Sequence, residues 1–122
     1  PDMVKNQILF IPESRGDELI SFYRSCSLFV YPSVAEGFGI PPLEAAALRV
    51  PVICANTTSM GDFSFLGDGL FNPDSLDELK KKIIEKLNNK EPLDYTIQEI
   101  VRSRYTWKSA AEKFSGLVFR NN

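Results

Sequence analysis

Continuous apolar runs along the chain predict a small set of buried strands. The runs at 8–11, 28–31 and 50–54 show no polar alternation, as is typical of strands that are covered on both faces. A proline directly follows each of the first two runs and ends the strand, because proline cannot donate to the ladder. The apolar pair at 70–71 predicts a short edge strand. Residues 57–69, rich in Gly, Ser, Thr and Asp, predict a loop.

Helical spacing occupies the intervals between these runs. An apolar stripe with acidic residues in its first turn predicts a helix over 16–26. The pair Pro41-Pro42 predicts the start of a second helix, ending near Arg49, because proline is tolerated at the first helical position. Ser75, followed three residues later by Glu78, is a capping-box pattern that predicts an amphipathic helix to Leu87.

The end of the chain is also predicted to be helical. Helical spacing recurs over 95–101 and 106–119. The apolar side chains expected to face inward from the last helix are Ala110, Ala111, Phe114, Leu117 and Val118. The lysines at 80–82 and 86 are expected on a solvated helix face.

Strands that alternate with helices predict the fold class. Apolar strands joined by helices form a parallel sheet with helices on both faces, connected by right-handed crossovers. We therefore expect a Rossmann-like α/β fold in a single domain over 1–122, with the C-terminal helices starting at about residue 92. The chain lacks an initiator Met and enters an apolar run within a few residues, which favours a piece of a longer protein.

Charge and composition exclude several classes of function. A net charge of −2 gives no field that attracts nucleic acid, so no nucleic-acid partner is expected. The absence of histidine excludes a Ser-His-Asp constellation and an imidazole zinc site. Cys26 and Cys54 lie in apolar contexts without metal-ligand spacing and are expected to be buried free thiols. The opening residues resemble neither a leader nor a membrane span, so we expect a cytoplasmic protein.

The loop at 32–40 is the candidate ligand site. It joins the end of a predicted strand to the start of a helix, where open parallel sheets bind ligands. Gly37 and Gly39 let the backbone approach a ligand closely, and a helix N-terminus favours a phosphate. Glu36 can accept hydrogen bonds from sugar hydroxyls, and Glu44 can accept them from a ribose diol.

Each of these features also has a structural explanation. Glu44 can be a first-turn residue that complements the helix dipole and caps free N–H groups. Glu36 can be a solvated loop carboxylate, and Gly37 and Gly39 can be turn residues with positive φ.

Two other nucleotide- or phosphate-handling classes fit poorly. A dinucleotide fingerprint needs a third glycine after Gly37 and Gly39, but Pro42 stands there, so a dehydrogenase is disfavoured. A receiver-type signalling domain needs an acidic cluster at the end of its first strand, which the run at 8–11 lacks.

The combined motifs resemble a known family. Tyr31-Pro-Ser33 is followed by Glu36-Gly-Phe-Gly-Ile-Pro-Pro-Leu-Glu-Ala-Ala46 and then by Pro51-Val-Ile53. This order resembles glycosyltransferase family four of the GT-B fold, also called glycosyl transferases group 1, with its two glutamates separated by seven residues. The resemblance runs from about Ile8 to Phe114. Arg49 stands where the family usually has glycine.

The resemblance implies the C-terminal, donor-binding half of a retaining glycosyltransferase. Such an enzyme moves a sugar from a GDP- or UDP-linked donor to a glycan or lipid-linked acceptor, without a cofactor and usually without a metal. The acceptor is bound mainly by an N-terminal half that is absent here, so this fragment is expected to be inactive alone. A hexosyltransferase is implied, with mannose as the first sugar to test. Peripheral association with the inner membrane face is a further expectation for the full-length protein.

The resemblance also assigns roles to residues. It implies that Glu36 contacts hydroxyls of the donor sugar as the catalytic residue and that Glu44 holds the ribose. The backbone amides of Gly37, Phe38, Gly39 and Ile40 are expected to meet the sugar and phosphate. The alternative is a non-catalytic nucleotide-binding or scaffold domain of the same fold, and the sequence upstream of Pro1 would distinguish the two.

Overall fold

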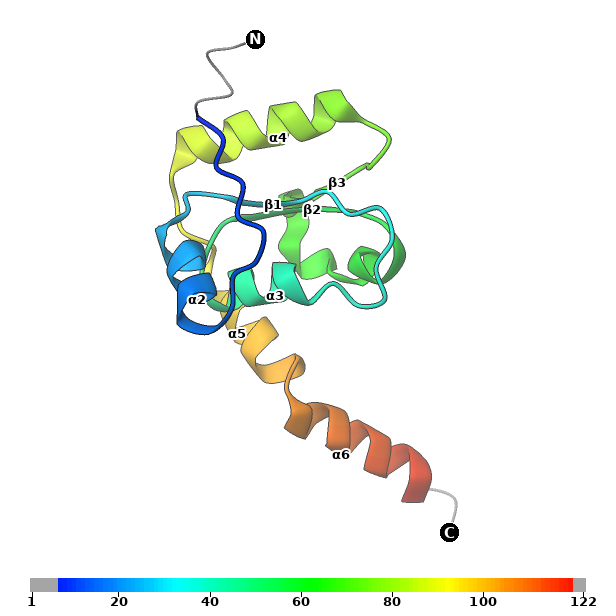
Figure 1. The fold of residues 1–122 in the computed structure, drawn as a ribbon. Helices are drawn as coiled ribbons and strands as arrows, with labels where there is room; N and C mark the ends of the chain where they lie inside the picture. The colour runs from blue at the N-terminus through cyan, green and yellow to red at the C-terminus, as the bar shows by residue number, and fades with distance from the viewer. Residues whose placement is uncertain (1–6, 120–122) are drawn as a thin grey trace.

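Three short parallel strands form the sheet, in the order in which they occur along the chain (Figure 1). The computed structural model describes residues 7–119. The strands are β1 (Phe29–Tyr31), β2 (Val52–Ala55) and β3 (Leu70–Phe71). All four residues of the central strand β2 are buried, which confirms the prediction from the apolar run at 50–54. The two-residue strand at 70–71 is likewise confirmed.

Helices lie on both sides of this sheet. They are α2 (Gly16–Ser25), α3 (Ile40–Ala47), α4 (Leu76–Asn89), α5 (Tyr95–Arg104) and α6 (Trp107–Val118). In Figure 1, α4 crosses one side of the sheet while α2 and α3 lie on the other. The expectation of a Rossmann-like α/β fold with a parallel sheet between helices is confirmed. Residues 1–6 and 120–122 of the predicted domain lie outside the described residues.

The core forms where α3 packs against the sheet. Ala45 and Ala46 of α3 are fully buried, and their small side chains allow the helix to approach β2 closely. Pro41 and Pro42 occupy the first turn of α3, as predicted from the proline pair. The sequence order of proline pair, alanine-rich helix and apolar strand thus builds the centre of the fold.

The segment 57–69 is not an irregular loop, contrary to prediction. It forms two 3₁₀ helices, η1 (Thr58–Asp62) and η2 (Ser64–Gly69). Met60, Phe63 and Leu66 recur every third residue and are buried in the core. A spacing of three matches the three residues per turn of a 3₁₀ helix. The polar composition of the segment obscured this apolar face.

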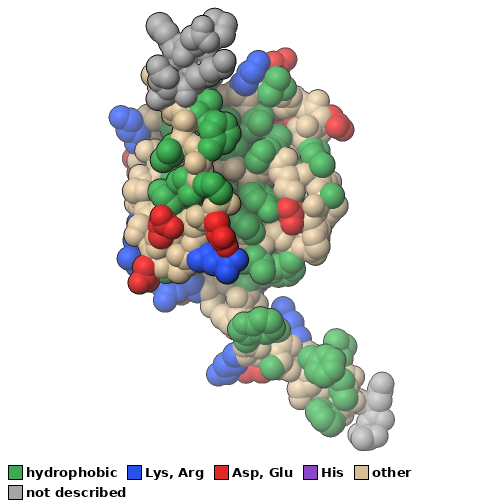
Figure 2. Space-filling model, in the orientation of Figure 1, with side chains coloured by type: hydrophobic (Ala, Val, Ile, Leu, Met, Phe, Trp, Pro, Cys, Tyr) green, Lys and Arg blue, Asp and Glu red, His purple; other side chains and the backbone are tan. Residues whose placement is uncertain are grey.

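The predicted strand at 8–11 is wrong. These residues form no strand, and each side chain exposes 42–85% of its surface. Figure 2 shows apolar side chains gathered over the N-terminal segment. An apolar run becomes a strand only where a neighbouring strand pairs with its backbone, and within residues 7–119 no strand pairs with this run.

The last helix forms as predicted but does not pack inward. Thr106 caps α6 by accepting a hydrogen bond from the Ser109 N–H at 3.0 Å. The helix extends away from the sheet (Figures 1 and 2), and Phe114 and Leu117 are 69% and 74% exposed. Helical spacing identified an amphipathic helix correctly. Inward burial was the wrong inference, because the described part of the chain offers this face no surface to pack on.

The amphipathic helix α4 is only partly covered. The Ser75 Oγ accepts a hydrogen bond from the Glu78 N–H at 3.2 Å, which confirms the cap. Leu79 and Ile83 pack against the core, whereas other members of the predicted apolar stripe remain exposed. The exposed members are Leu76, Ile84 and Leu87.

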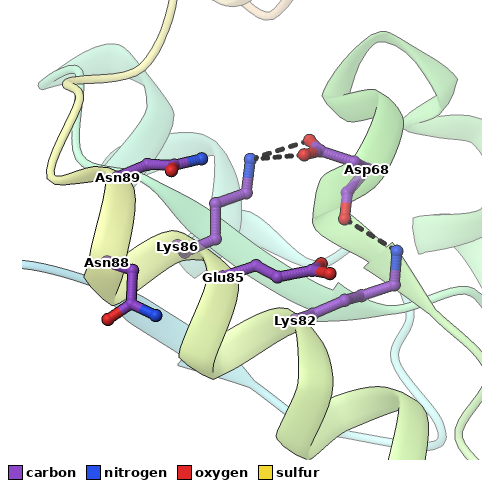
Figure 3. Close-up of a pocket in the computed structure, with 6 residues that line it drawn as sticks. All are labelled: Asp68, Lys82, Glu85, Lys86, Asn88 and Asn89. Atoms are coloured by element: carbon purple, nitrogen blue, oxygen red, sulfur yellow. Dashed lines mark hydrogen bonds and ion pairs between the residues drawn. The ribbon is translucent and has the colours of Figure 1, made fainter.

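Two of the lysines predicted to be solvated instead bind η2 (Figure 3). The Lys82 Nζ donates to the Asp68 carbonyl at 2.9 Å, and the Lys86 Nζ lies 2.7 Å from the Asp68 carboxylate. Lys80 and Lys81 are exposed as predicted. The lysine face of α4 is therefore divided between solvent and a contact that ties the helix to the rest of the domain.

The two cysteines differ in environment. Cys54 is a buried free thiol in β2, as predicted, and burial raises its pKa to about 11. Cys26 lies just past the end of α2, is only half-buried and donates to the Tyr23 carbonyl at 3.3 Å. The prediction of a buried, strand-like thiol is wrong for Cys26.

Arg49 ends the chain reversal between α3 and β2. It has φ of 61°, in the left-handed region that favours glycine. Its Nε donates to the Leu93 carbonyl at 3.0 Å, and its guanidinium lies 5.9 Å from the centre of the Tyr95 ring. The arginine therefore occupies a backbone conformation suited to glycine, and its side chain joins α3 to the start of α5.

We expect Arg49→Ala to destabilise the domain by about 1–2 kcal/mol, because it loses the side-chain contacts and keeps the left-handed strain. Arg49→Gly loses the same contacts but relieves that strain, so its loss should be smaller by about 1 kcal/mol. Urea unfolding of the three proteins measures the difference. Equal stability of the two variants would contradict the role assigned to the backbone.

Candidate functional site

The loop between β1 and α3 lies at the carboxyl edge of the sheet, beside the loop that follows β2. The two loops are joined by hydrogen bonds. The Glu36 N–H donates to the Thr58 Oγ1 at 3.3 Å, and the Ser59 Oγ donates to the Glu36 carbonyl at 3.3 Å. The Thr57 Oγ1 donates to the Val34 carbonyl at 3.4 Å. Because β1 and β2 are parallel, their ends meet here, where α/β sheets bind ligands.

The Glu36 side chain is held by two hydroxyl groups. The Tyr31 phenol and the Ser33 hydroxyl each donate to its Oε1, both at 2.7 Å. The hydrogen bond from Tyr31, followed by that from Ser33, lowers the pKa of Glu36 below its usual value. The same bond raises the pKa of Tyr31 to about 12. Glu36 is therefore an ionised carboxylate that two hydroxyl groups orient. It is also a partly solvated loop carboxylate, as the structural alternative expected.

Glu44 is held by a third hydroxyl group. The Tyr23 phenol, reaching across from α2, donates to its Oε2 at 3.0 Å. Burial, and then the bond to Glu44, raises the pKa of Tyr23. The first turn of α3 contains no acidic residue, and no side chain caps the helix. The alternative that Glu44 is a first-turn cap is therefore wrong.

An aromatic row connects the supports of the two glutamates. The ring of Phe29 lies 5.3 Å from that of Tyr23 and 6.0 Å from that of Tyr31, measured between centroids. Tyr23 of α2 and Tyr31 of β1, which donate to the two carboxylates, therefore pack against the same ring of Phe29.

Sequence reasoning missed these supporting residues. In the sequence, Tyr23 falls within the apolar stripe of the helix predicted over 16–26, and Tyr31 ends an apolar run and begins the family motif. Ser33, three residues before Glu36, carried a local signal, because a serine can reach a side chain at that spacing across a turn. Nothing in the sequence pointed to Thr58 or Ser59, which reach Glu36 only through the fold.

The two glycines of the loop differ. Gly39 is buried with φ of 85°, and a Cβ placed on it would lie 2.7 Å from the Met60 Cγ. Gly37 has no positive φ, and a Cβ there would meet nothing within 4 Å. The structural alternative of positive φ is therefore right for Gly39 and wrong for Gly37. Gly37 instead leaves its backbone open to a ligand.

Backbone donors at this end of α3 come from the loop more than from the helix. Pro41 and Pro42 lack N–H groups, so two of the donors that a helix N-terminus normally offers are missing. Within residues 7–119 the amides of 37–39 donate to no protein acceptor. These loop amides, with that of Ile40, are the groups available to an anion.

Phe38 fixes the tip of the loop. Its ring is 49% exposed and makes edge contacts with Phe63, at 6.3 Å, and with Tyr105, at 5.9 Å between centroids. Ile40 is 57% exposed beside it. The loop therefore presents a carboxylate, open amides and an apolar surface together.

Two cavities of the domain lie away from this loop. A cavity of about 370 Å³ lies between α4 and η2 (Figure 3), and its lining includes Asp68, Lys82 and Lys86. A second, of about 200 Å³, is lined by residues near Pro51 and Leu93. None of the residues 36–44 lines either cavity. Four residues of the loop and of the helix after it are exposed: Gly37, Phe38, Ile40 and Glu44.

Among the described residues, no three His, Cys, Asp or Glu side chains converge as a metal site requires. No described helix has the length and apolar character needed to cross a membrane. The expectations of metal-free chemistry and of a cytoplasmic location stay predictions.

Comparison with known proteins identifies relatives. The family model described as "Glycosyl transferases group 1" matches residues 3–103. The serotype-specific mannosyltransferase WbdA of Escherichia coli is 37% identical over 82 residues, which cover 67% of this chain and 10% of that protein. The O-antigen chain mannosyltransferase B of Escherichia coli is 36% identical over 84 residues, or 66% of this chain and 20% of that protein.

A third relative comes from another organism. The capsular polysaccharide biosynthesis glycosyltransferase CapM of Staphylococcus aureus is 39% identical over 94 residues, which cover 76% of this chain and 25% of that protein. The chain thus spans a quarter or less of these three relatives. No solved structure matches it significantly.

Proposed function

This chain belongs to the glycosyl transferases group 1 family, and from that premise we propose that it is the donor-binding half of a retaining glycosyltransferase. The enzyme moves a sugar from a nucleotide-diphosphate sugar to a glycan or lipid-linked acceptor. The observation that carries the proposal is the pair of glutamates, each held by a tyrosine phenol, on either side of a loop with free amides.

Each part of the site has a proposed role. Glu36 accepts hydrogen bonds from hydroxyls of the donor sugar, and Glu44 accepts them from the ribose diol. The amides of 37–40 donate to the sugar and to the diphosphate, where negative charge grows as the glycosidic bond breaks. Carboxylates cannot hold the diphosphate, so cations outside this site complete its binding. The reaction proceeds with retention and without a metal.

The relatives suggest the sugar and the acceptor. Two of them are named mannosyltransferases, one of these for the O-antigen chain, and the third is named for capsular polysaccharide biosynthesis. We infer that this enzyme transfers mannose from a GDP- or UDP-linked donor in the synthesis of a surface polysaccharide. An acceptor of this kind is consistent with peripheral association of the full-length protein with the inner membrane face.

The exposure of the site supports the proposal that this chain binds donor without turning it over. Gly37, Phe38, Ile40 and Glu44 are exposed, so this chain would cover a ligand laid on them from one side only. Transfer needs a closed, water-excluding site with the acceptor in place. We propose that another part of the polypeptide supplies that second wall.

Calorimetric titration of the chain and of the full-length protein with GDP- and UDP-sugars tests this function. We expect Glu44→Ala to weaken donor binding about tenfold or more, because a charged acceptor is lost from the ribose. Glu85→Ala, on the exposed face of α4, is the control and should bind as the wild type does.

Unchanged affinity of Glu44→Ala would overturn the ribose assignment. The non-catalytic alternative makes a separate prediction, since a scaffold domain would bind donor in the full-length protein but transfer nothing to any acceptor. A radiolabelled-donor transfer assay on the same samples distinguishes the two.

A further inference from the structure

Glu36 is fixed from both its backbone and its side chain. Thr58 and Ser59 of η1 occupy its N–H and carbonyl, as described above. Tyr31 and Ser33 both donate to a single carboxylate oxygen, Oε1. An oxygen of an ionised carboxylate has two lone-pair sites, so these two donors saturate Oε1.

The other oxygen is left open. Among the described residues, none donates to the Oε2 of Glu36. Glu36 is only partly buried, and the free amides of 37–39 follow it directly in the loop. A carboxylate with one saturated and one open oxygen can accept a ligand hydroxyl only at the open oxygen.

We propose that Tyr31 and Ser33 are positioning residues that direct the Oε2 of Glu36 at the donor sugar. This inference rests on the proposed function of Glu36. The open oxygen retains two lone-pair sites, so it suits two neighbouring hydroxyls of one sugar ring. A donor lacking one of those hydroxyls would leave part of this acceptor unpaired and would be discriminated against.

The surroundings of Glu36 make Tyr31 and Ser33 the groups that control its ionisation. From β1 it meets the Tyr31 phenol, and from its own loop the Ser33 hydroxyl. From η1 it meets Thr58 and Ser59, which carry no charge. Removing either donor to Oε1 therefore raises the pKa of Glu36 and frees the carboxylate to rotate.

Steady-state kinetics of the full-length enzyme with Tyr31→Phe and Ser33→Ala tests the inference. Each variant is expected to lower kcat/KM about tenfold, as for loss of a hydrogen bond to a charged group. Activity needs ionised Glu36, so kcat/KM decreases at low pH around the pKa of Glu36. This decrease is the acid limb of the pH profile. Both variants should move that limb to higher pH. Ser33→Thr, which retains the hydroxyl, should restore the wild-type rate and pH profile.

The matched control is Tyr95→Phe. It removes a phenol hydroxyl at the start of α5 and leaves the ring beside Arg49 in place, so rate and pH profile should stay as in the wild type. Circular dichroism verifies the fold of each variant. A merely structural role for Tyr31 would change stability without moving the acid limb.

Two outcomes separate this inference from the proposed function. If Glu36→Gln abolishes transfer while Tyr31→Phe and Ser33→Ala both keep the wild-type rate and acid limb, the positioning role is overturned and the function of Glu36 stands. If Glu36→Gln transfers sugar normally, the proposed function of Glu36 itself fails.

Discussion

Replacing Glu36 with glutamine is expected to reduce sugar transfer by the full-length enzyme about a hundredfold, the usual scale for losing one interaction aimed at the reacting group. Glutamine has the same size, and its amide oxygen can accept from Tyr31 and Ser33 as Oε1 does. The amide NH₂ then points at the donor sugar, where a hydroxyl needs an acceptor. The measurement is kcat/KM with a labelled nucleotide-sugar donor.

Glu85→Gln is the matched control for this change. Glu85 lies on the exposed face of α4, 3.9 Å from Lys81, and the same substitution there should leave transfer unchanged. Glu36→Gln is expected to fold normally, since a substitution at a loop carboxylate rarely unfolds a domain. Loss of cooperative unfolding in that variant would instead assign Glu36 a structural role.

Replacing Gly39 with alanine is expected to lower the free energy of unfolding by about 2–4 kcal/mol. Part of the cost is the left-handed backbone at φ of 85°, about 1–2 kcal/mol for a residue with a Cβ. The rest is overpacking, because the new Cβ would lie 2.7 Å from the Cγ of Met60, which is fully buried. Urea unfolding monitored by circular dichroism measures the change.

Gly37→Ala provides the comparison in the same loop. Gly37 has no positive φ and open space at its Cβ position, so stability should change by no more than about 0.5 kcal/mol. Donor binding by this variant should weaken, because the added methyl group restricts approach to the loop amides. Equal destabilisation by the two substitutions would refute the assigned difference between the glycines.

The local elements of this protein were predictable from its sequence. The apolar runs ending at Tyr31 and Cys54 identified β1 and β2, and the proline pair identified the start of α3. Ser75 and Glu78 identified the start of α4. These signals act over a few residues, through backbone conformation, capping and local hydrogen bonding. They can therefore be recognised in the sequence alone.

Three of the failed predictions depended on a distant partner. The run at 8–11 has strand composition, but strand formation requires a second strand beside it. The last helix has an apolar face, but burial requires a surface to receive it. Residues 57–69 have loop composition, yet the segment forms 3₁₀ helices and buries Met60 and Phe63 in the core.

The candidate site likewise combines local features, which the sequence predicted, with long-range contacts, which it did not. By itself, the sequence determined that two glutamates separated by seven residues flank a glycine loop between a strand and a helix, because that spacing is local. Only the tertiary structure decided which groups hold them: Tyr23 approaches Glu44 from another helix, and Thr58 and Ser59 approach Glu36 from beyond the next strand. Hydrogen bonds between residues more than twenty positions apart form only after the sheet has brought its loops to one edge.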